Sequence, residues 1–162
     1  MKTHFTIYVL LTIALFSCNL ISQKQIPSNE ELESRIKEMV TSGADELVIS
    51  NLTEFEWDSL IILAPYTLIE DCPERFNIDC GSIEHSGIQH LDDRCVLVFL
   101  NEGQICTMVE SKRHPGDFVP SVSRYFTPEE AIFRIVETDD QLESGEKWIE
   151  LKVKESTTPN TR

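Results

Sequence analysis

Cysteine is the residue type in this sequence whose chemistry depends most on spacing. The chain has five cysteines: Cys18, Cys72, Cys80, Cys95 and Cys106. A thiol can be acylated, can join a second thiol in a disulfide, or can bind a metal as a thiolate. The C-x-x-C spacing of zinc sites does not occur, so we expect no metal ligands among them. Cys18 stands apart at the end of an apolar segment, and the other four are an even number that could form disulfides.

Three carboxylates, Glu54, Glu56 and Asp58, alternate with Phe55 and Trp57. In an extended chain the acids lie on one face and the aromatic rings on the other. Two carboxylates could divide the acid and base roles of a glycosidase, and Trp57 could stack on a sugar. We favour the interpretation that both rings pack inward while the acids face water.

The histidines do not form a recognisable site. His85 and His90 lie in a glycine-containing segment beside three acids, Glu84, Asp92 and Asp93. This spacing matches no metal-ligand pattern and is typical of a solvated loop. The sequence contains no motif of serine hydrolases, zinc peptidases, P-loop proteins or dinucleotide-binding proteins. We therefore predict no catalytic residue, no metal and no cofactor, and a function that is not enzymatic.

The first residues indicate export. Lys2 supplies a positive start, and the segment from Phe5 to Phe16 is then apolar except for two threonines. This segment is shorter than the roughly 20 residues that a membrane-spanning helix needs. Its end, Leu15-Phe16-Ser17-Cys18, resembles the lipobox of bacterial lipoproteins, in which the cysteine is acylated and becomes the first residue. We predict a signal peptide over 1–17 and lipid attachment at Cys18; a secreted protein and an uncleaved anchor are the alternatives.

The net charge of −14 limits the partners. Nucleic acids and anionic lipid surfaces attract Lys and Arg, so we expect no nucleic-acid binding and no flat contact with a membrane. The predicted contact with the membrane is the N-terminal lipid, with the domain facing the periplasm or the exterior of the cell envelope. A cationic protein partner is compatible with the charge, although solubility alone also accounts for it.

The sequence predicts a single α+β domain over residues 29–155, after a tether over 18–28 and before a disordered tail over 156–162. Ser28 and Glu31 have capping-box spacing, the apolar positions that follow recur with helical period, and Gly43 ends the helix. Alternating or continuous apolar runs predict strands at 46–50, 60–63, 95–100, 105–110, 132–137 and 147–154. We expect one antiparallel sheet of about five strands with the N-terminal helix packed on one face.

Three segments carry weaker or conflicting signals. Thr67 and Glu70 have capping-box spacing for a short helix that Pro73 disfavours. Residues 79–94 are polar enough to be read as a loop. Residues 127–131 combine a helix start at Thr127-Pro128 with the alternation of a strand, and we favour a strand from Ile132.

The hairpin that we predict around Gly103 constrains the cysteines. With a turn of two or three residues, Cys95 faces residue 110 or 109. Cys106 is then three or four residues away from the position that faces Cys95, which is about 10–13 Å along the strand. A disulfide needs Cα atoms within about 7 Å, so a Cys95–Cys106 bridge is excluded if the hairpin forms. Three alternatives stay open: two bridges from Cys72 and Cys80 to the hairpin, a Cys72–Cys80 bridge alone, or four reduced cysteines.

The segment from Phe55 to Thr67, with its Phe-x-Trp-Asp start, apolar strand and Pro-Tyr-Thr end, resembles a segment of small, uncharacterised bacterial membrane lipoproteins. The 95–110 hairpin and Gly116-Asp117-Phe118 are also similar to that family. The resemblance implies a lipoprotein but no activity. We expect an envelope-bound binding or interaction module with a candidate surface formed by Trp57, Asp58, Pro65, Tyr66 and Thr67. The alternative is an inhibitor or immunity-type protein that captures a cationic partner.

Overall fold

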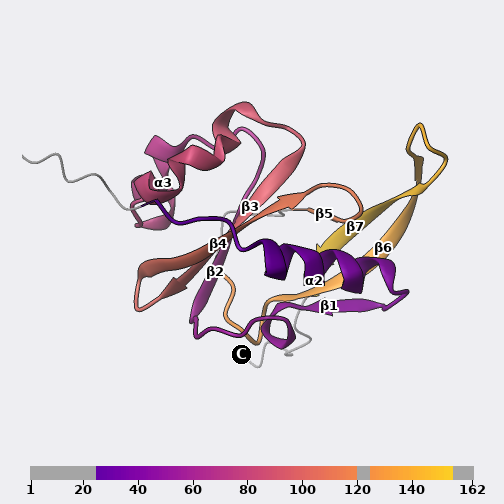
Figure 1. Ribbon diagram of the computed structural model, residues 1–162, viewed down its shortest axis with the longest axis horizontal. Helices are drawn as coiled ribbons and strands as arrows, with labels where there is room; N and C mark the ends of the chain where they lie inside the picture. The colour runs from indigo at the N-terminus through magenta and orange to yellow at the C-terminus, as the bar shows by residue number, and fades with distance from the viewer. Residues whose placement is uncertain (1–24, 120–124, 155–162) are drawn as a thin grey trace, which may run out of the picture.

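The domain contains two β-sheets rather than the single five-stranded sheet that we predicted. The computed structural model describes residues 25–119 and 125–154 (Figure 1). One sheet has the strand order β2-β3-β4, and the other has the order β1-β6-β7-β5. The strands are β1 (Glu46–Val48), β2 (Ser59–Leu63), β3 (Arg94–Asn101), β4 (Gln104–Lys112), β5 (Asp117–Phe118), β6 (Ile132–Gln141) and β7 (Lys147–Val153). The α+β class and the N-terminal helix are confirmed, but β5 pairs parallel to β7, so the second sheet is mixed.

Strand β3 is the centre of the fold because both of its faces are covered. Its residues from Cys95 to Leu100 are at most 1% exposed. Alternate side chains enter two separate apolar clusters, with Leu97 and Phe99 in one and Val96 and Val98 in the other. A strand buried on both faces needs apolar residues at every position, which explains the unbroken apolar run in the sequence.

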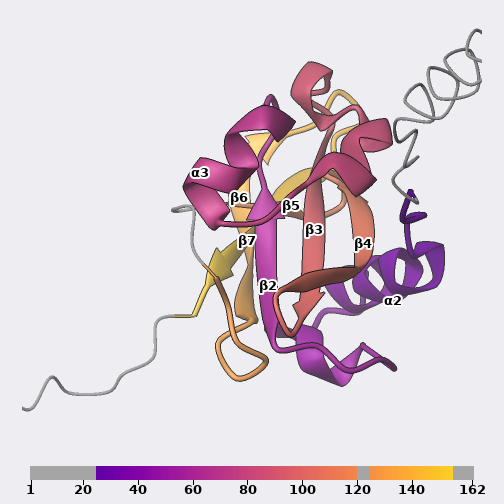
Figure 2. The same ribbon diagram turned by 90° about the vertical axis from the view of Figure 1, so that its left-hand side faces the viewer.

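The first cluster joins the two sheets. Phe99 and Leu97 of β3 pack with Phe133 of β6 and Leu151 of β7, and helix α2 (Glu30–Thr41) contributes side chains to the same cluster. Figure 2 shows β2, β3 and β4 side by side, with β6 and β7 behind them and α2 at one edge. The helix therefore closes the open side of a two-sheet core instead of lying on one isolated sheet.

Helix α2 begins one residue later than we predicted. Asn29 is its N-cap, and the Asn29 Oδ1 accepts a hydrogen bond from the Leu32 N–H at 3.0 Å. Ser28 is engaged elsewhere, because its Oγ accepts a hydrogen bond from the Glu110 N–H at 2.9 Å. The predicted end is confirmed: Gly43 follows the C-cap residue with a φ of +82°.

The β3–β4 hairpin has a tight turn followed by a bulge. Glu102 and Gly103, the two turn residues, have φ angles of +50° and +74°, as in the mirror-image turns that match strand twist. Leu100 pairs with Ile105 but Phe99 pairs with Thr107, so Cys106 is an extra residue in β4. The bulge shifts the register by one residue.

The second cluster is covered by residues 64–93, which we call the covering segment. It contains the short helix α3 (Cys72–Phe76) and short 3-10 helices at Ile69–Asp71, Gly81–Ser86 and Ile88–His90. We predicted a polar loop over 79–94, and this is wrong: Ile83 and Ile88 are fully buried against the β2-β3-β4 sheet. Pro73 lies in the first turn of α3, where a missing N–H costs no hydrogen bond.

The conflicting signals at 127–131 produce a single turn before strand β6. Glu130 accepts a hydrogen bond from the Thr127 N–H at 3.1 Å, and the Ala131 N–H donates to the Thr127 carbonyl. Strand β6 then starts at Ile132, as we predicted. The local helix start gives one turn, which ends where Ala131 and Ile132 pair with Ile49 and Val48.

The predicted signal peptide, Cys18 and the tail over 156–162 lie outside the described residues. The predicted tether lies partly inside them, and there it contacts the domain. The Ile26 N–H donates to the Ser82 carbonyl at 3.0 Å, and the Ile26 side chain packs against the second cluster. Within residues 25–119 and 125–154, the helices are all too short or too polar to cross a membrane.

Candidate functional site

An open cleft of about 590 Å³ lies between the C-terminal end of α2, the loop after β4 and the β6–β7 hairpin. We call it the hairpin cleft. Figure 1 shows that the β6–β7 hairpin projects at the end of the molecule opposite α3. The cleft is lined by Val40, Thr41, Gly43, His114, Pro115, Glu137, Glu146, Lys147 and Ile149.

One glycine brings the walls of the cleft together. A Cβ added at Gly116 would lie 3.0 Å from Val40 Cγ1 and 3.2 Å from Leu151 Cδ1. The absence of a side chain at residue 116 therefore lets the loop that carries His114 lie close to both α2 and β7 without displacing Val40 or Leu151. On the opposite wall, Glu137 pairs with Ile149 across the two strands of the hairpin.

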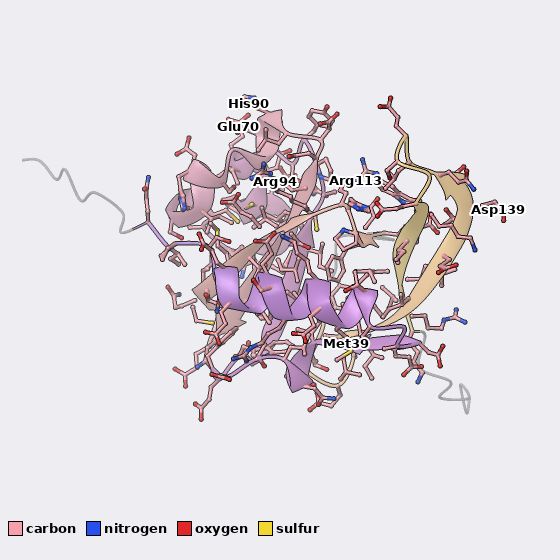
Figure 3. All side chains as sticks on the ribbon, turned by 45° about the vertical axis from the view of Figure 1, so that its right-hand side comes forward. Met39, Glu70, His90, Arg94, Arg113 and Asp139 are labelled. Carbon is pink, nitrogen blue, oxygen red and sulfur yellow. The ribbon has the colours of Figure 1, made fainter. Side chains whose placement is uncertain are left out.

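The base of the loop is held by Arg113. Its Nε and Nη2 donate to the Asp117 Oδ2 at 3.0 and 2.8 Å, and its guanidinium lies 5.5 Å from the centre of the Trp148 ring. Asp117 is 8% exposed, and its hydrogen bonds raise the pKa of Arg113. Figure 3 shows Arg113 between the β2-β3-β4 sheet and the β6–β7 hairpin. A buried carboxylate with a charged partner fixes this loop against the hairpin.

The charged groups of the cleft are mainly acidic. Lys147 Nζ lies 2.7 Å from Glu137 Oε2, and this ion pair raises the pKa of Lys147. Glu146 Oε2 lies 3.4 Å from His114 Nε2 and accepts a hydrogen bond from Ser144 Oγ. Helix α2, which the structure describes in full, has no basic residue in its last turn, so the partial negative charge of its C-terminus is not offset there.

This arrangement favours one class of ligand. Two carboxylates and a helix C-terminus attract positive charge, and only one lysine opposes them. The apolar wall formed by Val40, Pro115 and Ile149 could hold a hydrocarbon stem. The cleft therefore suits an amine or guanidinium group carried on an aliphatic chain. Sequence reasoning missed this site, because His114 and Glu146 are far apart in the chain and carry no motif.

The structure places the five residues of our predicted surface at the two opposite ends of β2. Trp57 is 9% exposed, its ring centre lies 5.2 Å from that of Phe99, and its Nε1 donates to Thr53 Oγ1 at 3.0 Å. Asp58 is exposed and accepts a hydrogen bond from the Glu102 N–H at 2.7 Å. These two residues anchor the start of β2 to the β3–β4 hairpin.

The other three residues of that surface lie beyond the opposite end of β2. Pro65 is partly buried, and Thr67 is 7% exposed with its hydroxyl donating to the Ala64 carbonyl at 2.7 Å. Tyr66 is 60% exposed and has a φ of +62°. The structure therefore does not bring the five residues together, and Tyr66 is the one with a widely accessible ring.

The four cysteines of the described residues are not joined by disulfides. Cys95 lies opposite Ser111, one residue beyond the position that we predicted, because of the bulge at Cys106. Burial raises the pKa of Cys95 to about 12. Cys106 is exposed, and its Sγ lies 3.4 Å from the Phe99 carbonyl oxygen. Cys72 and Cys80 are both buried in the covering segment.

The metal candidates of the sequence do not converge. His85 and His90 are exposed on separate 3-10 turns of the covering segment. Within residues 25–119 and 125–154, no group of three or more histidine, cysteine or acidic side chains could hold a metal ion. Asp93 instead pairs with Arg94 at 2.8 Å, which lowers the pKa of Asp93.

Exposed acidic side chains occur in several elements of the described domain, from α2 to the covering segment. The β6–β7 hairpin is nevertheless dense in them, with Glu137, Asp139, Asp140, Glu143 and Glu146. Figure 3 shows Asp139 at the outer edge of this hairpin. The two hairpin acids that line the cleft are thus part of a larger negative region.

No protein-family model, curated protein or solved structure matches this chain. The resemblance to small bacterial lipoproteins stays a prediction from the sequence.

Proposed function

We propose that this chain is a cell-envelope lipoprotein, acylated at Cys18, whose domain binds a ligand without changing it chemically. The proposal is supported by the apolar N-terminal segment that ends at Leu15-Phe16-Ser17-Cys18. Several acyl chains, each contributing about 0.8 kcal/mol per buried methylene, hold a protein on a bilayer almost permanently. The ligand site in this proposal is the hairpin cleft.

The observation that carries the binding role is the position of the cleft relative to the tether. Ile26, near the end of the predicted tether, lies beside the covering segment, whereas the β6–β7 hairpin lies at the other end of the molecule (Figure 1). From Cys18 to Ile26 an extended chain reaches at most about 28 Å. A domain held at one end by this short tether would present the cleft away from the membrane.

The lipid is tested by growth of an expressing bacterium with a labelled fatty acid. We expect label in the wild-type chain and none in Cys18→Ala, and we expect Cys18→Ala to leave the membrane fraction. A Cys106→Ala variant controls for the loss of a thiol and should keep the label. Equal labelling of wild type and Cys18→Ala would end the lipoprotein proposal.

The acidic lining of the cleft favours a second candidate, the capture of a cationic partner. In this version the ligand is a lysine or arginine side chain of another protein, as in an inhibitor or immunity protein. Glu137 and Glu146 would pair with the cation, and Val40 and Ile149 would contact its aliphatic stem. Because exposed acids also occur outside the cleft, from α2 to the covering segment, charge alone would give weak, unspecific binding.

An oligolysine peptide is a suitable probe for both versions of the site. Calorimetric titration should show binding to the wild type that weakens about tenfold, or about 1.4 kcal/mol, in Glu137→Gln/Glu146→Gln. The matched control is Asp139→Asn/Glu143→Gln, which removes the same charge from the same hairpin outside the cleft. If both double variants bind equally, the cleft is not the site and only the general charge of the surface attracts the peptide.

A further inference from the structure

The covering segment is the part of the domain with the least regular structure. It covers one face of the β2-β3-β4 sheet with α3 and short 3-10 helices only. Short helical segments that are not paired in a sheet open more readily than central strands do. Cys72, the first residue of α3, and Cys80, directly before the Gly81–Ser86 turn, both lie in it.

The side chains of Cys72 and Cys80 meet inside this layer. They are 0% and 1% exposed, and the interaction with the other thiol is the largest influence on the pKa of each. Both belong to the cluster that includes Ile61 and Val98 of the sheet. Two thiols in direct contact, held in one buried cluster, are placed for a covalent bond between the sulfurs.

The other two cysteines are kept away from this pair. Cys95 is on the opposite face of β3, where it packs with Leu97 and Phe99 in the first cluster. Cys106 is the bulge residue of β4, and its Sγ contacts the Phe99 carbonyl. Neither Cys95 nor Cys106 belongs to the cluster that holds Cys72 and Cys80.

We propose that Cys72 and Cys80 are joined by an intrachain disulfide in the exported protein. The proposal rests on the export that the proposed function includes, because disulfides persist in the oxidising compartments outside the cytoplasm. The oxidant is a protein or small-molecule disulfide. One thiolate attacks a sulfur of that disulfide and releases the first thiol of the oxidant. The second cysteine then attacks the mixed disulfide and releases the other thiol, so that two thiols are oxidised and one disulfide is reduced.

The interaction makes the two thiols unequal in the folded domain. The hydrogen bond with Cys80, followed by the charge of Arg75, lowers the pKa of Cys72 in spite of its burial. The same hydrogen bond and burial raise the pKa of Cys80. Because both sulfurs are buried in the folded domain, the exchange takes place before the covering segment closes or while it is open.

The pairing is tested on the purified full chain, independently of where the cell places it. The chain is unfolded, refolded in a buffer of oxidised and reduced glutathione, quenched with acid and alkylated in denaturant. We expect alkylation of Cys95 and Cys106 and a linked pair of peptides that contain Cys72 and Cys80. Four alkylated cysteines in the described domain, or a linked pair that includes Cys95 or Cys106, would overturn the proposal.

The state in the cell is tested with the same alkylation on membrane and soluble fractions. A membrane-bound chain with Cys72 and Cys80 unavailable for alkylation supports both proposals. A membrane-bound chain with both thiols alkylated overturns the disulfide and leaves the lipoprotein. A soluble chain that forms the bridge in the refolding experiment overturns the lipoprotein and leaves the pairing.

Melting temperature gives a further readout with a matched control. A reductant should lower the melting temperature of the wild type and of Cys106→Ala. It should not change that of Cys72→Ala/Cys80→Ala, because this variant has no bridge to lose. A reductant effect that survives in the double variant would contradict the assignment.

Discussion

The Asp58 carboxylate accepts a hydrogen bond from the backbone N–H of Glu102 at 2.7 Å, across 44 residues of sequence. Glu102 is the first residue of the β3–β4 turn and has a φ of +50°. The Asp58 N–H in turn donates to the Leu100 carbonyl at 2.9 Å. Asp58, the acid of the Phe-x-Trp-Asp segment, thus holds the strained β3–β4 turn next to strand β2.

The first prediction concerns this contact. Asp58→Ala should lower the free energy of unfolding by about 1 kcal/mol, because it removes a charge-assisted hydrogen bond to the turn. Asp58→Asn keeps an acceptor oxygen and should lose less. The measurement is denaturant unfolding, with Glu56→Ala as the control for loss of an exposed acid. If Asp58→Ala and Glu56→Ala agree within about 0.5 kcal/mol, the contact does not stabilise the fold.

Tyr66 carries the second prediction. Its φ of +62° lies in the left-handed region, where a bulky residue costs about 1–2 kcal/mol and asparagine costs less. Its backbone N–H donates to the Ile88 carbonyl at 3.0 Å, which holds the conformation in place. Tyr66→Asn should therefore raise the free energy of unfolding by about 1 kcal/mol, because the ring is mostly exposed.

Leu68→Asn is the control for this change. Leu68 is 43% exposed and has an ordinary φ of −74°, so asparagine should bring no gain there. A loss of stability in Tyr66→Asn would mean that contacts of the ring outweigh the backbone strain. Tyr66→Asn would then no longer isolate a surface role for the tyrosine.

The third prediction concerns the close approach at Gly116. Gly116→Ala should lower the free energy of unfolding by about 1–3 kcal/mol, because its Cβ would meet Val40 and Leu151 in a packed region. A double-mutant cycle with Val40→Ala tests the cause. The cost of Gly116→Ala should shrink when Val40 is truncated; strictly additive effects would place the cost elsewhere.

The fourth prediction is a pH dependence from Cys95. Burial, followed by the charge of Asp117, raises its pKa from 9.0 to about 12 in the folded domain. Between these two values the unfolded chain releases a proton that the folded domain retains. The contribution of Cys95 to stability is therefore fully present below pH 9 and is lost as the pH rises toward 12, by about 1.4 kcal/mol per pH unit.

Denaturant unfolding of wild type and Cys95→Ala from pH 7 to pH 11 checks this dependence. Cys95→Ala should be less stable at neutral pH, because it leaves a small cavity. The difference in the free energy of unfolding between wild type and Cys95→Ala should become smaller above pH 9. A constant difference over the whole range would show that the thiol ionises alike in both states.

The sequence by itself determined the local elements of this protein. Helix α2, the Gly103 turn and the strands around 60–63 and 95–100 follow from apolar period and turn chemistry, which act between near neighbours in the chain. The small error at the start of α2 has a long-range cause. Ser28, a suitable N-cap, is hydrogen-bonded to Glu110 of β4 instead.

Only the tertiary structure decided how these elements combine. The apolar run of β3 indicated burial, but not that a second sheet would cover one face and an irregular segment the other. The hairpin cleft and the Cys72–Cys80 contact form only when the two sheets, α2 and the covering segment pack together. Such contacts depend on which faces are left to bury after all strands have paired, and that is a property of the whole chain rather than of any segment.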